Sequence, residues 1–299
     1  MPNVSLCKQE NEIHYNPYID YSSEYLTFVA KESGTFTFTP KNSNVISYST
    51  DNGTTWTEGN SITVNNGDKV LWKGTMTPSA SYPRGSGTFS STGNFDVQGN
   101  AMSLLFGDDY KGKTDLTGKD SAFYQLFKNG TKVVNAENLS LPAETLASSC
   151  YEEMFYDCTS LTTAPELPAT TLAHGCYKYM FVKCTSLETT PQLPATTLAD
   201  YCYWYMFQGC TSLTTAPVLP AITLVSGCYG YMFQDCTNLN YIKAMFTTTP
   251  NGSSPNYYTS NWVSGVSATG TFIKNAAAQW DVSGVNGIPT GWTVETASE

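Results

Sequence analysis

The clearest pattern of apolar and polar positions lies in the middle of the chain, which repeats every 26 residues from residues 141, 167, 193 and 219. In the first copy, apolar side chains recur every four residues, at Leu146, Cys150, Met154 and Cys158. This spacing predicts one face of a short helix or helical turn. Prolines in the segment that follows, residues 162–167, exclude a regular helix there. Each copy is therefore predicted to hold a short helix, a turn and a short strand.

A repeat of fixed period predicts a solenoid, because one copy cannot bury its apolar face alone and neighbouring copies must stack. The stacked strands are expected to form a parallel sheet. Residues 122–127 (Ala-Phe-Tyr-Gln-Leu-Phe) echo the Cys-Tyr-x-x-Met-Phe of the full copies. We interpret them as a degenerate first repeat that caps the stack.

The residues before the repeats show a different pattern. Thr35 to Thr39 alternates apolar and polar side chains, and turn sequences such as Asp51-Asn52-Gly53 separate several short segments of this kind. This pattern predicts a small antiparallel Ig-like β-sandwich. After the repeats, Trp262, Phe272, Trp280 and Trp292 lie among glycines and β-formers, which is typical of a β-rich cap.

The predicted fold class is thus mainly β with short helices: a small β-sandwich, a leucine-rich-repeat solenoid and a C-terminal cap. The predicted segments are an N-terminal arm (1–23), the sandwich (24–97), an N-terminal cap with the degenerate repeat (98–140), four repeats (141–244) and the C-terminal cap (245–299).

Comparison of the four copies separates inward from outward positions, because positions that must pack stay fixed. Trp204 stands where the other copies have Glu152, Lys178 and Gly230, so we expect its side chain to be exposed. The candidate ligand-binding residues form an aromatic patch on the predicted helical side: Trp204, Tyr205, Tyr201, Tyr179 and Tyr231. Rigid aromatic rings of this kind suit stacking on sugars or anchoring a protein partner. The alternative is that the rings lie flat on the surface or pack against a neighbouring copy of the chain.

Eight of the nine cysteines fall in two columns of the repeat, and Cys7 is the ninth. Disulfides between neighbouring copies would bend a regular stack, and a Cys-x7-Cys spacing without histidines is not a zinc pattern. We therefore interpret the two columns as small buried thiols, at 150, 176, 202 and 228 and at 158, 184, 210 and 236.

Residues 49–56 match the pattern S-x-D-x-G-x-T-W, which resembles the Asp-box of sialidases. Physically, the carboxylate of Asp51 is expected to accept backbone N–H groups in the turn while Trp56 packs beneath it. A sialidase also needs a cluster of arginines for the substrate carboxylate, and Arg84 is the single arginine of this chain. We interpret the box as structural.

Charge and composition narrow the function classes. The net charge is −10, with 15 basic and 25 acidic residues, which argues against nucleic acid and against anionic membranes as partners. No apolar run approaches the ~18 residues of a membrane-spanning helix, so membrane insertion is not expected. The N-terminal sequence shows no secretory signal.

Catalysis is not expected. His14 and His174 are the only histidines, and no serine or cysteine lies in a nucleophile motif with a base. Glu152 and Glu153 are adjacent carboxylates on a predicted solvated surface, without a second pair to act as acid and base. No catalytic residue, metal ligand or cofactor is predicted.

The motif Met-Phe-x-x-Cys-Thr-Ser-Leu, followed by Leu-Pro-Ala, resembles the BspA-type leucine-rich repeat of surface proteins from gut and oral anaerobes and their phages. The resemblance covers roughly residues 100–246. It implies adhesion or receptor binding, with a protein or glycan on a host or bacterial cell surface as partner, and a virion, extracellular or cell-surface location. Residues 1–97 are expected to attach the chain to virion or assembly partners. The alternative is a structural or decoration protein of a virion or surface assembly.

Overall fold

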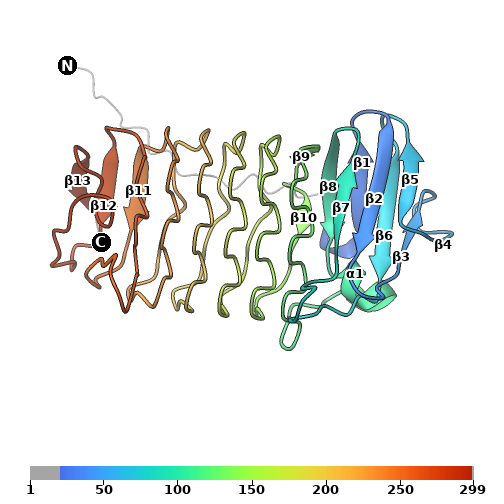
Figure 1. Cartoon of the computed structure of the whole chain (residues 1–299), viewed down its shortest axis with the longest axis horizontal. Coiled ribbons are helices and arrows are strands. Elements are labelled where there is room, and N and C mark those ends of the chain that lie inside the picture. The colour runs from blue at the N-terminus through green and yellow to red at the C-terminus, as the bar shows by residue number, and fades with distance from the viewer. Residues whose placement is uncertain (1–20, 298–299) are drawn as a thin grey trace, which may run out of the picture.

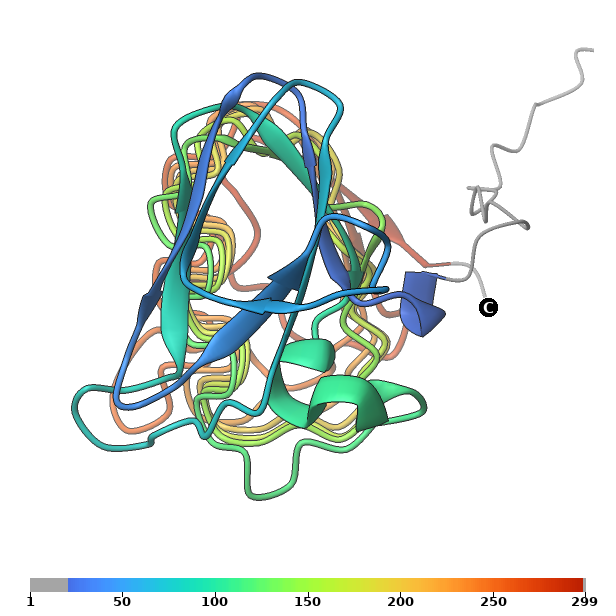
Figure 2. The same ribbon diagram turned by 90° about the vertical axis from the view of Figure 1, so that its right-hand side faces the viewer.

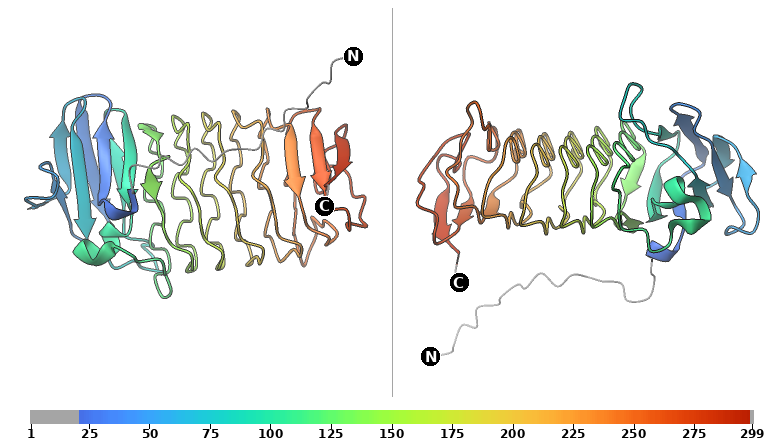
Figure 3. Two further views of the ribbon diagram at one scale, coloured as in Figure 1. Left: turned by 180° about the vertical axis from the view of Figure 1, so that it is seen from behind. Right: turned by 90° about the horizontal axis from the view of Figure 1, so that it is seen from below.

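The computed structural model describes residues 21–297, which form an elongated molecule (Figure 1). A β-rich N-terminal part occupies one end, the repeats follow in chain order, and a small parallel sheet lies at the other end (Figures 1 and 3). The expected N-terminal arm lies outside the described residues, except that Tyr21–Ser23 form a short 3₁₀ helix, η1. Among the described residues, no helix is long and apolar enough to cross a membrane.

Two sheets build the N-terminal part. The larger has the strand order β10-β8-β1-β6-β3-β4, with β9 also paired to β8, and the smaller has the order β5-β2-β7. The strands are β1 (Leu26–Ala30), β2 (Gly34–Pro40), β3 (Ile46–Ser49), β4 (Thr57–Glu58), β5 (Ser61–Val64), β6 (Lys69–Gly74), β7 (Gly87–Ser91), β8 (Phe95–Asn100), β9 (Val133–Asn135) and β10 (Leu139–Ser140).

An aromatic core joins these two sheets. Phe28 on β1 contacts Phe36 of β2 and Phe89 of β7, with ring centroids 5.4 and 4.8 Å apart. Phe28 also contacts Trp72 of the larger sheet, and all four side chains are almost fully buried. Burial of these rings helps to hold the two sheets together.

The larger sheet continues beyond the predicted sandwich boundary. Strands β9 and β10 come from the segment expected to be a cap, and both pair with β8 in parallel. The sheet is therefore mixed, not the purely antiparallel sheet of an Ig-like domain. The short helix α1 (Ser103–Phe106) and the 3₁₀ helix η2 (Gly107–Tyr110) follow β8.

The predicted leucine-rich-repeat solenoid, with a helix and a strand in each copy, is wrong. From residue 141 to 240 the structure describes neither an α-helix nor a strand. Only isolated bridges connect the extended segments of these copies, for example Thr145 with Thr171 and Thr163 with Thr189. The sheets lie at the two ends of the molecule, and the β-rich character is the part of the prediction that agrees.

Four-residue turns replace the predicted helix. In the first copy, Ser149, Glu153 and Asp157 have φ of 54, 58 and 59°. A left-handed residue at every fourth position prevents a helix, which needs right-handed φ throughout. The same positions have positive φ in every full copy, and also at residues 121, 125 and 129 before them and 257, 261 and 265 after them.

Successive backbone N–H groups in this segment alternate between two kinds of hydrogen-bond acceptor. Glu152 and Met154 donate to carbonyls three residues back, at 3.1 and 3.2 Å. Tyr151, Glu153 and Phe155 donate instead to carbonyls of the next copy, at 2.9 to 3.0 Å. Each copy is therefore bound to its neighbour through the backbone, and the copies superimpose when viewed along the long axis (Figure 2).

Columns of identical side chains fill the interior of the stacked copies. Phe127, Phe155, Phe181, Phe207 and Phe233 stack with centroids 5.2 to 5.9 Å apart. A parallel column starts at Phe123 and continues through four buried tyrosines, 151, 177, 203 and 229. Because each ring packs on its equivalent, the core has the same cross-section from copy to copy.

All eight cysteines of the repeats are free and buried, whereas Cys7 lies outside the described residues. In the second column each thiol donates to the carbonyl of a Phe in an earlier copy, as from Cys184 to Phe155 at 3.1 Å and from Cys210 to Phe181 at 3.0 Å. Burial raises the pKa of Cys176 and Cys236 to about 12. These groups are therefore neutral thiols at physiological pH.

The C-terminal sheet is parallel, with β11 (Tyr241–Ala244), β12 (Thr271–Lys274) and β13 (Thr293–Thr296) in that order. Trp262, Phe272, Trp280 and Trp292 are buried around it. Trp262 lies against Phe233, the last ring of the Phe column, with centroids 6.2 Å apart. The aromatic side chains thus cover the end of the repeat interior.

The left-handed positions generate a first prediction. Lys183 is exposed with φ of 59°, and Gly209 occupies the equivalent position of the next copy. We expect Lys183→Val to lower the free energy of unfolding by about 1–2 kcal/mol, since a β-branched residue is strained in this conformation. Lys183→Gly should cause no such loss. Urea unfolding measures the free energy of unfolding of both variants, and Glu188→Val, at an exposed position, is the control. An equal loss of stability in Lys183→Val and Glu188→Val would contradict the left-handed conformation assigned to residue 183.

A second prediction concerns the thiols. In a Cys7→Ser variant, we expect iodoacetamide at pH 8 to leave the native protein unlabelled, because only exposed thiolates react. In denaturant, eight labels should be added, as counted by mass spectrometry. The melting temperature should be the same with and without reductant. Labelling of the native protein, or a reductant-dependent melting temperature, would overturn the buried-thiol assignment.

Candidate functional site: an aromatic strip

The structure brings all five predicted site residues into one cluster. Tyr179, Tyr205 and Tyr231 occupy the same left-handed position of three successive copies, with φ of 59, 59 and 57°. Their side chains point outward from the turns and are half-buried. Tyr201 and Trp204 precede Tyr205 on the same turns and are also half-buried. We call these five residues the aromatic strip.

Three tyrosine rings form a ladder along the molecule. Tyr205 and Tyr231 lie face to face, with centroids 4.3 Å apart and planes 1° from parallel. Tyr179 stacks on the other side of Tyr205 at 5.0 Å and 25°. Burial and the neighbouring tyrosines raise the pKa of Tyr205 to about 12, whereas hydrogen bonds with Ser260 and Asn261 lower the pKa of Tyr231. The Tyr205 hydroxyl is therefore protonated at neutral pH.

Trp204 lies nearly perpendicular to its neighbours. Its ring makes angles of 70 and 69° with Tyr205 and Tyr231, and 70° with Tyr201. A Cβ at Gly230 would come within 2.1 Å of Trp204 Cζ3, and one at Gly227 within 2.5 Å of the Tyr201 ring. Trp204 and Tyr201 thus occupy space that the two glycines of the next copy leave open, and Trp204 is less exposed than we expected.

Ion pairs adjoin the strip on its N-terminal side. Arg84, from the loop between β6 and β7, binds Glu152 at 2.8 Å, and Lys178 approaches the same carboxylate at 3.9 Å. Lys128 pairs with Glu153, which also accepts a hydrogen bond from Gln125 at 2.9 Å. The expectation that these carboxylates are solvated is wrong for Glu152, which is 5% exposed. Sequence reasoning missed this contact, although a single arginine opposite a charged repeat position is a usable signal.

The chemistry-bearing residues outside the strip have local partners. Asp51 accepts hydrogen bonds from the Thr55 N–H at 2.9 Å, from the Thr55 hydroxyl and from the Ser49 hydroxyl, and these bonds lower its pKa to about 2. Trp56 donates to the Gly53 carbonyl. His174 is exposed beside Tyr201, and His14 lies outside the described residues.

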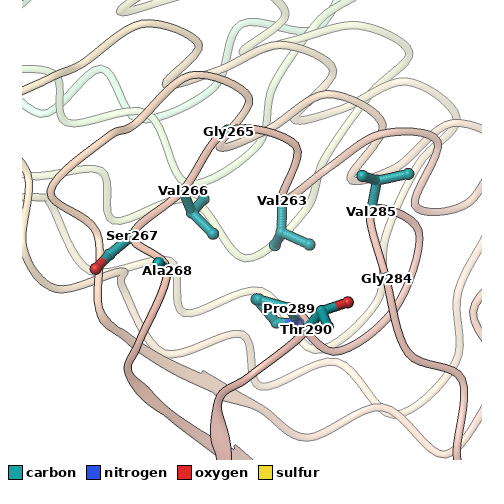
Figure 4. A pocket seen from close by; sticks show the side chains of 9 residues that line it. All are labelled: Val263, Gly265, Val266, Ser267, Ala268, Gly284, Val285, Pro289 and Thr290. Atoms are coloured by element: carbon teal, nitrogen blue, oxygen red, sulfur yellow. The ribbon is translucent and has the colours of Figure 1, made fainter.

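Two further observations bear on ligands. Within residues 21–297, no group of three or more His, Cys, Asp or Glu side chains is placed to hold a metal ion. Two hollows are lined by no residue of the strip. One, of about 190 Å³, is lined by Val263, Val266, Val285 and Pro289 among others (Figure 4), and the second lies between residues 42–44 and 77–80.

No protein-family model, curated protein or solved structure matches this chain.

The two glycines beneath the strip generate a third prediction. Gly230→Ala should displace the Trp204 ring and destabilise the protein by about 1–3 kcal/mol, as overpacking does. In the Trp204→Ala background the same change should cost much less, because the clashing ring is gone. A double-mutant cycle of unfolding free energies measures this coupling, with Gly59→Ala, whose Cβ would meet only Tyr48, as the control. Additive effects would contradict the ring placement.

Proposed function

We propose that the chain is a non-catalytic recognition protein that binds a protein or glycan on a host or bacterial cell surface through the aromatic strip. The BspA-type resemblance supports the same role, and a phage tail or virion component is the setting we favour. The observation that carries this proposal is the clustering of five half-buried aromatic side chains from three successive copies. Aromatic side chains dominate the binding energy of protein interfaces.

The ion pairs beside the strip support a role for the N-terminal part in presenting the strip to a partner. Arg84 belongs to the N-terminal part, and its ion pair with the buried Glu152 carboxylate joins that part to the repeats. Its guanidinium also lies 4.4 Å from the Tyr124 ring centroid. A planar cation held by a carboxylate and a ring has little rotational freedom. This contact helps to hold the first repeat against the part that we expect to attach the chain to its assembly.

The alternative is a structural or decoration protein. The observation that favours it is β13, which is exposed along its whole length and pairs, among the described strands, with β12 alone. An uncovered edge of this kind can accept another strand. In that case the strip would be dispensable for assembly, and the chain would be found within a larger particle without binding cells.

The test is binding of the fluorescently labelled protein to a panel of intact anaerobic bacteria and to a glycan array. We expect Trp204→Ala to weaken binding at least about tenfold, as loss of an aromatic anchor does, and to lower the free energy of unfolding by about 1–2 kcal/mol, less than for a fully buried Trp. Tyr82→Ala removes a ring that is 97% exposed and outside the strip. It is the matched control, and it should bind as the unmodified protein does. Binding that survives Trp204→Ala, or no binding at all, would overturn the proposal.

A further inference from the structure

The C-terminal end of the molecule is closed on one side and open on the other. On the side of the turns, residues 285–287 take the place of a further copy. The Asn286 side chain accepts the backbone N–H of Asn261 at 2.7 Å, and the Gly287 carbonyl accepts the indole N–H of Trp262 at 2.8 Å. The last turns are thus capped from within the chain.

On the side of the strands, β13 ends the sheet, opposite the N-terminal part of the molecule (Figures 1 and 3). Among the described strands it pairs with β12 alone, and all four of its residues are exposed. The N–H groups of Thr293 and Ala297 bond to carbonyls on the β12 side, at 2.9 and 2.8 Å. Since the N–H and C=O groups of successive strand residues point to alternate sides, those of Val294 and Thr296 face away from β12. They form an edge that can accept another strand.

The apolar core stops short of this edge. Ile242, Phe272 and Val294 are in register on the three parallel strands, so their side chains point to the same side of the sheet. Ile242 and Phe272 are fully buried, whereas Val294 is 44% exposed. The row of interior apolar side chains thus continues to the edge of the sheet, where its last member is left partly uncovered.

The edge strands at the opposite end of the molecule, β4 and β5, lack this feature. Both residues of β4 are polar and exposed. On β5, Val64 is 2% exposed and is therefore already covered by the core. An added strand would thus complete an interior apolar row at β13, and it would complete none at β4 or β5.

The sequence of β13 is complementary to itself. A two-fold axis perpendicular to the sheet sets β13 antiparallel to its own copy and keeps the interior sides together. Centred on Val294, the two equivalent residues exchange both N–H···O bonds, and their side chains join the two apolar rows. Glu295 then lies opposite Thr293, whereas centring on Glu295 would place two like charges directly opposite each other. The strand also has no Lys, Pro or bulge of the kind that keeps edges from pairing.

We infer that β13 docks on β13 of a second copy of this chain, antiparallel and with Val294 opposite Val294. The two three-stranded sheets become one continuous sheet. Because the strands of this sheet follow one another along the long axis (Figure 1), the two molecules join end to end at their C-terminal ends. The pairing is independent of the aromatic strip, none of whose residues lies on β13.

The first experiment measures the mass of the full chain by analytical ultracentrifugation over a range of concentrations, and we expect a monomer–dimer equilibrium. Val294→Lys and Thr296→Pro should each raise the dissociation constant at least about tenfold. The first sets two cations together at the axis, and the second removes an N–H that faces away from β12. Val45→Lys is the matched control, because Val45 is an exposed valine of the N-terminal part. It should dimerise as the unmodified chain does.

The second experiment tests the register by oxidative cross-linking of Val294→Cys and Glu295→Cys, each in the Cys7→Ser background. The eight thiols of the repeats are buried and should not react. Equivalent residues at 294 would have Cα atoms about 5.5 Å apart, within the range of a disulfide. Those at 295 would be diagonal neighbours, about 7–8 Å apart. We expect Val294→Cys to give a covalent dimer on a non-reducing gel and Glu295→Cys to remain largely monomeric.

Three results would overturn this inference. One is a chain that stays monomeric at every concentration, including one whose β13 pairs with a strand of another protein instead. Another is a dimer that both Val294→Lys and Thr296→Pro leave unchanged, or that cross-links faster through residue 295 than through residue 294. The third is a mass that keeps growing beyond the dimer, because a two-fold pair is closed.

Discussion

The whole repeat region depends on one constraint: alternate backbone N–H groups must find carbonyls in the next copy. A left-handed residue at every fourth position turns these N–H groups toward the next copy. This conformation costs about 1–2 kcal/mol for each non-glycine residue. Hydrogen bonds of 2.7 to 3.1 Å between copies offset that cost. No single copy can form these bonds alone, so the turns are stable only as a stack. The end of the stack must then be covered, which is what Trp262 and the C-terminal sheet do.

The same constraint explains why chemically different side chains are confined to the outward positions. Inside, each Phe, Tyr or Cys meets its own equivalent, so a substitution in one copy disturbs two neighbours. Outside, the residues at the left-handed positions have solvent on one side and differ between copies: Gln125, Glu153, Tyr179, Tyr205, Tyr231 and Asn261 occupy one column. Because the column spacing is set by the backbone, three successive tyrosines are brought to stacking distance without any special loop. A recognition surface can therefore change by substitution alone.

Sequence reasoning found the outward residues but not the backbone that carries them. Apolar residues at 146, 150, 154 and 158 have a strict period of four, whereas a helix has 3.6 residues per turn and its stripe drifts. That strict period was the available signal for repeated turns. Positive φ at Glu153 or Tyr205 could not be anticipated, because these residue types rarely adopt it. The mixed sheet was missed because β9 and β10 are only three and two residues long, too short to show alternation.

The strip also shows how far variability between copies predicts the exposure of a side chain. Variation at position 204 predicts an exposed Trp side chain, whereas the ring is half-buried and packs over Gly227 and Gly230 of the next copy. Their missing side chains leave room for Tyr201 and Trp204 of the copy before. At these two positions a large residue in one copy is thus coupled to a small residue in the next. The proposed binding surface is preorganised, because the rings are held by their neighbours before any partner arrives, and the entropy that would be lost on binding is correspondingly small.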